Sequence, residues 1–172
     1  MAITQNDFST QPGGAVPGQS GDTSPQINDA LTVAEGSEFT YGDIAVSSAS
    51  GQHYVENMKA GATFFEGVVA RFFRKGNRSM MNNAPYEAAP SVKFTNPDTV
   101  TLSIFGRWGV LASEAITAKG QAAVDENGNW VEAKVGAYAI QGATYETLGG
   151  KDEVVFVRLT GGRLITLIEA AA

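Results

Sequence analysis

Few side chains in this sequence could take part in acid–base, nucleophilic or metal chemistry. His53 is the single histidine among 172 residues, and the chain has no cysteine. The lack of cysteine excludes disulfides, thiolate catalysis and Cys-ligated metal sites. A histidine base needs a nucleophile or an orienting carboxylate within reach, and the nearby Ser48 and Glu56 form no known nucleophile motif. We therefore expect His53 to be an exposed loop or structural residue, and the chain to hold no catalytic residue, metal or cofactor.

The alternation Asp125-x-Asn127-x-Asn129 resembles the opening of a calcium-binding loop. The sixth position of such a loop is glycine, but Trp130 stands there in this sequence. The dipeptide Asn127-Gly128 between extended flanks instead predicts a β-hairpin with a type I′ turn, in which both central residues have positive φ.

A basic run with two aromatic residues extends from Arg71 to Arg78 and contains Arg71, Arg74, Lys75 and Arg78. One interpretation places the charges on a solvated loop and a phenylalanine in the core. A second docks the basic patch on an acidic protein surface. A third binds single-stranded nucleic acid through phosphate contacts and stacking. The net charge of −6 disfavours the third, so we take the four basic residues as candidates for protein docking.

The charge content and the apolar runs of the sequence bear on membrane insertion and secretion. Charged residues make up only 17% of the chain, below the roughly 25% typical of globular domains. No run of about 18 apolar residues is present, which predicts that no helix spans a membrane. The first residues also have neither the basic nor the apolar region of a secretory signal.

Hydrophobic periodicity indicates an all-β fold, either a small antiparallel barrel or a sandwich of jelly-roll type. Val100, Leu102 and Ile104 alternate with polar or outward residues, which is the pattern of a half-buried strand. Gly106 interrupts that pattern and suggests a bulge or a corner. Two further strands, over 154–159 and 164–168, flank Gly161-Gly162 and could pair as a hairpin.

The first 30 residues differ from the rest, because they are rich in Gln, Gly, Pro, Ser and Thr. Such a segment cannot bury enough apolar surface to fold alone. We expect an extended arm over residues 1–30 that contacts other chains, with Phe8 as its aromatic anchor. A single β domain is then expected over residues 31–172.

The second half of the chain carries five features in a fixed order: an alternating strand, a Gly-Arg-aromatic-x-Val segment, a Lys-Gly turn, a Gly-Ala-x-aromatic-x-Thr segment and a valine-rich last strand. In this sequence these are 100–104, 106–110, 118–120, 142–147 and 154–159. In this order of features the chain resembles the cement, or head-decoration, proteins of tailed bacteriophages.

The resemblance implies a structural virion protein without catalysis. Such a protein would bind the outside of an icosahedral head and bridge neighbouring major capsid subunits. Its partners would be the major capsid protein and itself, as a homodimer or homotrimer, with no nucleic acid and no membrane. Its place would be the outer capsid surface, after assembly in the host cytoplasm.

Two alternatives stay open at this point. One is another β-rich part of the virion, in the tail or neck. The other is a carbohydrate-binding sandwich that uses Trp108, Trp130 or Tyr145 as exposed stacking platforms, although burial of these aromatic residues in the core is the simpler expectation.

Overall fold

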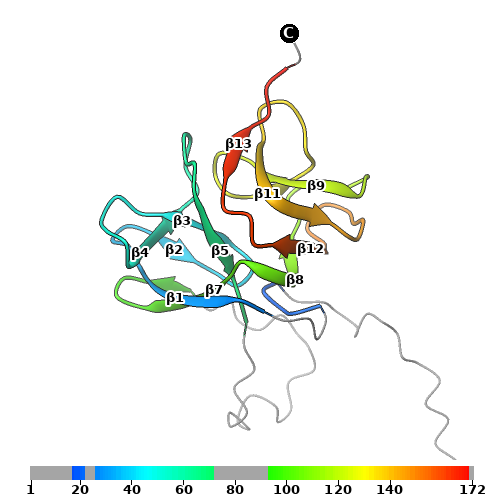
Figure 1. The fold of residues 1–172 in the computed structure, drawn as a ribbon. Coiled ribbons are helices and arrows are strands. Elements are labelled where there is room, and N and C mark those ends of the chain that lie inside the picture. The colour runs from blue at the N-terminus through cyan, green and yellow to red at the C-terminus, as the bar shows by residue number, and fades with distance from the viewer. Residues whose placement is uncertain (1–16, 22–25, 72–92, 171–172) are drawn as a thin grey trace, which may run out of the picture.

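The computed structural model describes residues 17–21, 26–71 and 93–170, and these ranges fold entirely into strands, turns and loops (Figure 1). The expected all-β fold is confirmed. Within the described ranges, no helix could span a membrane.

Five strands close into a barrel, which forms one half of the molecule (Figure 1). In barrel order these are β1 (Asn28–Val33), β4 (Tyr54–Asn57), β3 (Ile44–Ser47), β5 (Phe65–Val69) and β7 (Thr99–Ser103). The pair β1–β4 is parallel and the others are antiparallel, so the expectation of an antiparallel barrel holds for four of the five pairs. An odd number of strands cannot alternate in direction all the way round a closed ring, which requires one parallel pair.

A second, curved sheet forms the other half, with a small two-stranded sheet beside the barrel. The second sheet has the order β10 (Trp130–Val131), β9 (Gly120–Val124), β11 (Tyr138–Tyr145), β12 (Val154–Thr160) and β8 (Phe105–Leu111), with β13 (Ile165–Leu167) also on β11; the small sheet pairs β2 (Glu38–Phe39) with β6 (Phe94–Thr95). An isolated parallel bridge between Ala112 and Trp130 joins the two ends of the second sheet.

The chain crosses from the barrel to the second sheet at Ile104, between β7 and β8. Gly106 follows this break with φ of 109°, a backbone conformation that residues with a Cβ rarely adopt. The corner that this glycine predicted is therefore present. Val100 and Leu102, on the alternating strand before it, are fully buried as expected.

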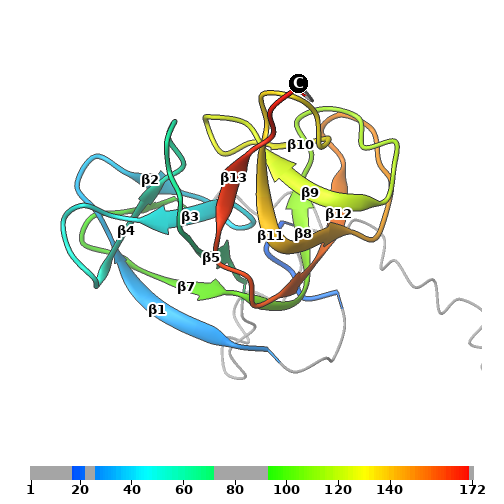
Figure 2. The same ribbon diagram turned by 45° about the horizontal axis from the view of Figure 1, so that its top comes forward.

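The expected hairpin between the last two strands is wrong. β12 and β13 lie one after the other along the same edge of β11, with Leu159 opposite Ala143 and Ile165 opposite Ile140 (Figure 2). Gly161 and Gly162 thus connect two strands that follow each other along one edge of β11, and they do not form a hairpin turn. The other edge of β12 is already occupied by β8, which leaves no place for β13 there.

The hairpin at residues 125–129 is present, but its turn is not type I′. Gly128 has φ of 85°, whereas Asn127 is not among the described residues with positive φ. The carboxylate of Asp125 explains the difference, because its Oδ1 accepts hydrogen bonds from the backbone N–H groups of Asn127 (2.8 Å) and Asn129 (2.9 Å). The sequence Asp-x-Asn-x-Asn therefore serves a side-chain-capped loop.

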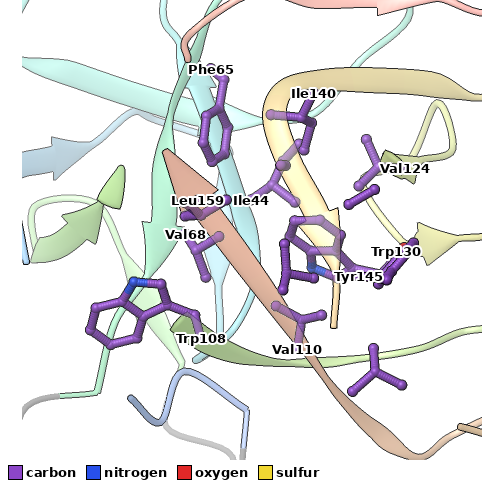
Figure 3. Close-up of a cluster of buried hydrophobic side chains, with 14 of the residues drawn as sticks. Ile44, Phe65, Val68, Trp108, Val110, Val124, Trp130, Ile140, Tyr145 and Leu159 are labelled. Atoms are coloured by element: carbon purple, nitrogen blue, oxygen red, sulfur yellow. The ribbon is translucent and has the colours of Figure 1, made fainter. Parts of the chain in front are cut away.

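One hydrophobic core is shared by the barrel and the second sheet (Figure 3). Ile44, Phe65 and Val68 enter it from the barrel and meet Ile140 and Leu159 from the second sheet. A smaller cluster fills the barrel and includes Ala45 of β3 and Val69 of β5. Since β3 and β5 are buried on both faces, they read as apolar runs without clear alternation.

Three aromatic residues of the second sheet belong to this shared core. Trp108 is fully buried, and Trp130 and Tyr145 are each only 3% exposed. The Tyr145 hydroxyl lies 2.7 Å from the carbonyl oxygen of Val131, to which it donates. The expectation of core burial is confirmed, and the carbohydrate-binding alternative is wrong because its stacking platforms face inward.

Candidate functional site

Of the five residues that the sequence nominated for protein contact, the structure describes Arg71. Phe8, Arg74, Lys75 and Arg78 lie outside the described residues. The site can therefore be built from the places where residues 1–16 and 72–92 join the folded body. These are Pro17, Arg71 and Lys93.

Arg71 follows β5 at the end of the barrel and is half-buried. Its guanidinium carbon lies 5.4 Å from the centre of the Tyr41 ring, a cation–π contact. Its backbone N–H donates a hydrogen bond of 2.7 Å to the carbonyl oxygen of Gly18. The residue that precedes segment 72–92 thus lies against the N-terminal segment 17–21.

Tyr41 also reaches the other end of segment 72–92. Its ring meets the ring of Phe94 edge-on, with centroids 5.3 Å apart and planes at 80°. Phe94 begins β6, and its neighbour Lys93 pairs with Glu38 at 2.7 Å. Tyr41 therefore contacts both Arg71 and Phe94, which are described residues on either side of segment 72–92.

Residues 17–21 join the same place from the N-terminal side. A Cβ added at Gly42 would lie 2.8 Å from the Cβ of Pro17, which shows how closely the two residues pack. Beyond Pro17, the segment runs along the free side of β8, with an antiparallel bridge between Ser20 and Trp108. This part of the expected arm contacts its own chain, as does 28–30, which belongs to β1.

A shallow cavity of ≈ 210 Å³ opens beside Pro17, between the loop around Tyr41 and the second sheet. Asp43 lines it, and burial raises the pKa of its carboxyl above the ordinary 3.8 although Thr40 donates to it twice. Trp130 also lines the cavity, and its Nε1 donates a hydrogen bond of 3.0 Å to the carbonyl oxygen of Gly42.

His53 lies apart from these groups, in an exposed turn before β4. Its carbonyl oxygen accepts a hydrogen bond of 2.9 Å from the Thr32 N–H, which helps to align β1 with β4. A structural place in a turn is what the sequence predicted for it. Among the described residues, no group of three or more His, Cys, Asp or Glu is arranged to hold a metal ion.

Comparison with known proteins decides the family. The model of a family described as structural cement protein (E217 gp24/Pam3 gp6) matches residues 3–160. The chain belongs to this phage cement family. It is accordingly a structural protein that stabilises a phage capsid, and the resemblance seen in the sequence is confirmed.

One of two similar solved structures supports the fold. A chain from "The capsid of Myoviridae Phage XM1" is similar with a TM-score of 0.63 and 18% identity, covering 92% of this chain and 97% of that one. A chain from "The crystal structure of head fiber gp8.5 N base in bacteriophage phi29" has a TM-score of 0.49 and 11% identity, covering 81% and 98%. A search of the curated proteins gave no match.

Tyr41 is the residue of this site that sequence reasoning missed. It stands between Thr40 and Gly42 in a short, strand-like piece and carries no motif. Its importance comes from what long-range folding brings to it, since Gly18, Arg71 and Phe94 are far apart in the sequence. The basic run and the N-terminal arm were the two features of the sequence that pointed toward this end of the barrel.

Proposed function

We propose that this cement protein binds the outer surface of the capsid and bridges neighbouring major capsid subunits with the end of the barrel that carries Tyr41. The observation that supports this orientation is the meeting of Pro17, Arg71 and Phe94 around Tyr41. The N-terminal arm and the basic segment are the two parts nominated for contact with other chains. The described residues that flank them, Pro17, Arg71 and Lys93, all belong to this end of the barrel.

The charge distribution supports a docking role for the basic segment. Residues 72–92 contain Arg74, Lys75 and Arg78 against Glu87 alone, whereas the whole chain has a net charge of −6. A basic segment on an acidic body favours an acidic partner surface and orients the body away from it. In this proposal Arg71 fixes the start of the segment by its stacking on Tyr41.

Stabilisation of the shell follows from mass action. A protein that binds the assembled shell and not its separated subunits shifts the equilibrium toward the shell. Two attached segments that reach different subunits also act at high effective concentration once the body has docked. We propose that the protein does this as a homodimer or homotrimer, without catalysis, and without binding nucleic acid or membrane.

The test is co-sedimentation of the purified protein with undecorated, expanded capsids of its phage, together with the melting temperature of the shell. We expect saturable binding near one copy per capsid subunit and a higher melting temperature. Deletion of residues 1–16, and separately the triple change Arg74→Glu, Lys75→Glu and Arg78→Glu, should each weaken binding by tenfold or more. Lys119→Glu is the matched control for Arg74→Glu made alone, because it makes the same change in charge at an exposed lysine that precedes β9 in the second sheet.

Unchanged occupancy on shells after both changes would overturn the proposed orientation. Equal weakening by the single changes Arg74→Glu and Lys119→Glu would show that net charge alone, and not the Tyr41 end, governs binding. A binding ratio of a few copies per particle would place the protein at a single vertex and exclude a role over the whole shell.

A further inference from the structure

The N-terminal segment 17–21 is bound to the edge of β8 as a short added strand. The Gly18 and Gly21 N–H groups each donate a hydrogen bond of 2.7 Å, to the carbonyl oxygens of Gly109 and Arg107 respectively. In return, the Gly109 N–H donates 2.8 Å to the carbonyl oxygen of Gln19. An extended segment of this kind can fill an open sheet edge by backbone bonds alone.

Backbone bonds alone are a weak hold for this segment. Its residues Gly18, Gln19, Ser20 and Gly21 offer little apolar side chain to bury. The net gain of a backbone hydrogen bond is similar in size to the entropy lost when one residue is ordered. Pro17 adds close packing against Gly42 at the start of the segment, and Ser20 Oγ accepts a hydrogen bond of 2.7 Å from Gln26 Nε2. A side-chain contact at Gly21 would hold the other end of the segment on β8.

Arg107 of β8 supplies that contact. Its Nη1 donates a hydrogen bond of 3.0 Å to the carbonyl oxygen of Gly21, and its guanidinium carbon lies 4.2 Å from the centre of the Phe156 ring. Its Nε lies 2.7 Å from Glu146 Oε2, and the other oxygen of Glu146 pairs with Arg158. The guanidinium thus contacts the carboxylate of Glu146 and the ring of Phe156, while its Nη1 group donates to Gly21.

Gly21 fits against this arrangement because it has no side chain. A Cβ added there would lie 2.7 Å from two carbon atoms of the Phe156 ring and 2.9 Å from Arg107 Cγ. Its φ is outside the left-handed region, so the glycine is needed for space and not for backbone conformation.

We propose that Arg107, held by Glu146 and Phe156, is a positioning residue that fastens the N-terminal arm to β8 and sets the place from which it extends toward the shell. The link to shell binding rests on the function proposed above. The fastening itself is a property of the free protein and can be measured without capsids.

The test is hydrogen exchange of the full-length free protein, followed by shell binding of the same variants. In Arg107→Met the side chain keeps its apolar stem but loses the hydrogen bond to Gly21 and the ion pair with Glu146. We expect the Gly18 and Gly21 amides to exchange about tenfold faster or more, because a charge-assisted hydrogen bond is lost. Amides inside β12 should keep their protection, which reports that the body remains folded.

Two further variants make the result specific. Gly21→Ala changes the segment instead of Arg107, because the added methyl group would collide with Phe156 and Arg107. It should also raise the exchange rate of the amides at positions 18 and 21. Arg163→Met is the matched control, because Arg163 likewise pairs with a glutamate, Glu66 at 2.8 Å, and lies over an aromatic ring, Phe64 at 5.6 Å. It contacts β5 instead of the N-terminal segment and should leave exchange at Gly18 and Gly21 unchanged.

The outcomes separate this proposal from the proposed function. Unchanged exchange in both Arg107→Met and Gly21→Ala would overturn the fastening role, whatever the capsids show. Faster exchange together with about tenfold weaker shell binding would support the whole proposal. Faster exchange with wild-type shell binding would overturn the positioning role, and the effect of deleting residues 1–16 would then show independently whether the arm contributes to binding.

Discussion

Asp43 is half-buried, and loss of contact with water makes the ionised form of its carboxyl less favourable. Burial beside Trp130 raises its pKa most, the charge of Glu38 adds to this, and hydrogen bonds from Thr40 oppose it. In the unfolded chain Asp43 releases its proton near its ordinary pKa of 3.8, whereas the folded protein retains the proton to a higher pH. The contribution of Asp43 to the free energy of unfolding therefore falls as pH rises through this window.

The variant Asp43→Asn tests this at the level of one side chain. Asparagine keeps an oxygen that can accept from Thr40, but it cannot ionise. We expect the variant to gain stability relative to the wild type as the pH is raised from about 3 to about 7. Urea unfolding of both proteins across this range measures the difference. A difference that moves in favour of the wild type with rising pH would contradict the burial argument.

The burial of a single residue could be predicted from the sequence where the size and polarity of its own side chain decide it. The two tryptophans are large and apolar enough that burial follows from the side chain alone, and both are in the core. The places of Tyr41 and Arg107 could not be derived this way. Each depends on partners brought from distant strands, such as Phe94 for Tyr41 and Glu146 for Arg107.

At the level of elements, β11 is the strand on which the second sheet is organised. β9 pairs with one edge of it, and β12 and then β13 pair with the other. Its register with β9 shifts between Ala139 and Thr144, and Gln121 Nε2 donates to the carbonyl oxygens of Ile140 and Ala143 within the shift. Gly142 stands inside this bulge with φ of 72°.

The variant Gly142→Ala should be markedly destabilising. A Cβ there would lie 2.5 Å from Thr160 Oγ1, which now donates a hydrogen bond to the Gly142 carbonyl oxygen. Left-handed strain and overpacking together should lower the free energy of unfolding by about 2–4 kcal/mol. Gly136→Ala is the control, because Gly136 has φ of 87° with nothing within 4 Å of an added Cβ.

The control should lose only the cost of the backbone strain, about 1–2 kcal/mol. Denaturant unfolding of the two variants measures the gap between them. Equal losses would mean that the bulge has room for a methyl group and that close packing against Thr160 has no energetic weight.

Alternation along the chain predicted individual strands well and their partners poorly. The alternation in the sequence indicated that Val100 and Leu102 are buried, because the direction of a side chain in a strand is a local property. The partner of β13 was missed because pairing is decided by which sheet edge is open. That edge belongs to β11, and it is free for β13 only because β12 ends at Thr160.

For the whole molecule, the decisive feature is that the two halves share one core. Ile44, Phe65 and Val68 of the barrel pack with Ile140 and Leu159 of the second sheet (Figure 3). Separating the halves would expose this apolar surface to water, so neither half should unfold while the other remains intact.

We therefore expect a single cooperative unfolding transition. Tryptophan fluorescence and far-ultraviolet circular dichroism should give the same midpoint, and the calorimetric enthalpy should equal the van't Hoff enthalpy. Two separate transitions would show that the barrel and the second sheet are independent folding units despite their common core.

The pairing of β1 with β7 has a consequence for how the protein is made. Asn28 of the first strand lies opposite Ser103, and Thr32 lies opposite Thr99. The barrel cannot close until β7 has left the ribosome, roughly 4–14 s after β1 at a translation rate of 5–20 residues per second. Throughout that interval β1 lacks its antiparallel partner, so the nascent chain carries an exposed strand edge that can pair with other chains. Protection of this edge during synthesis, more than the stability of the finished fold, would then limit the yield of soluble protein.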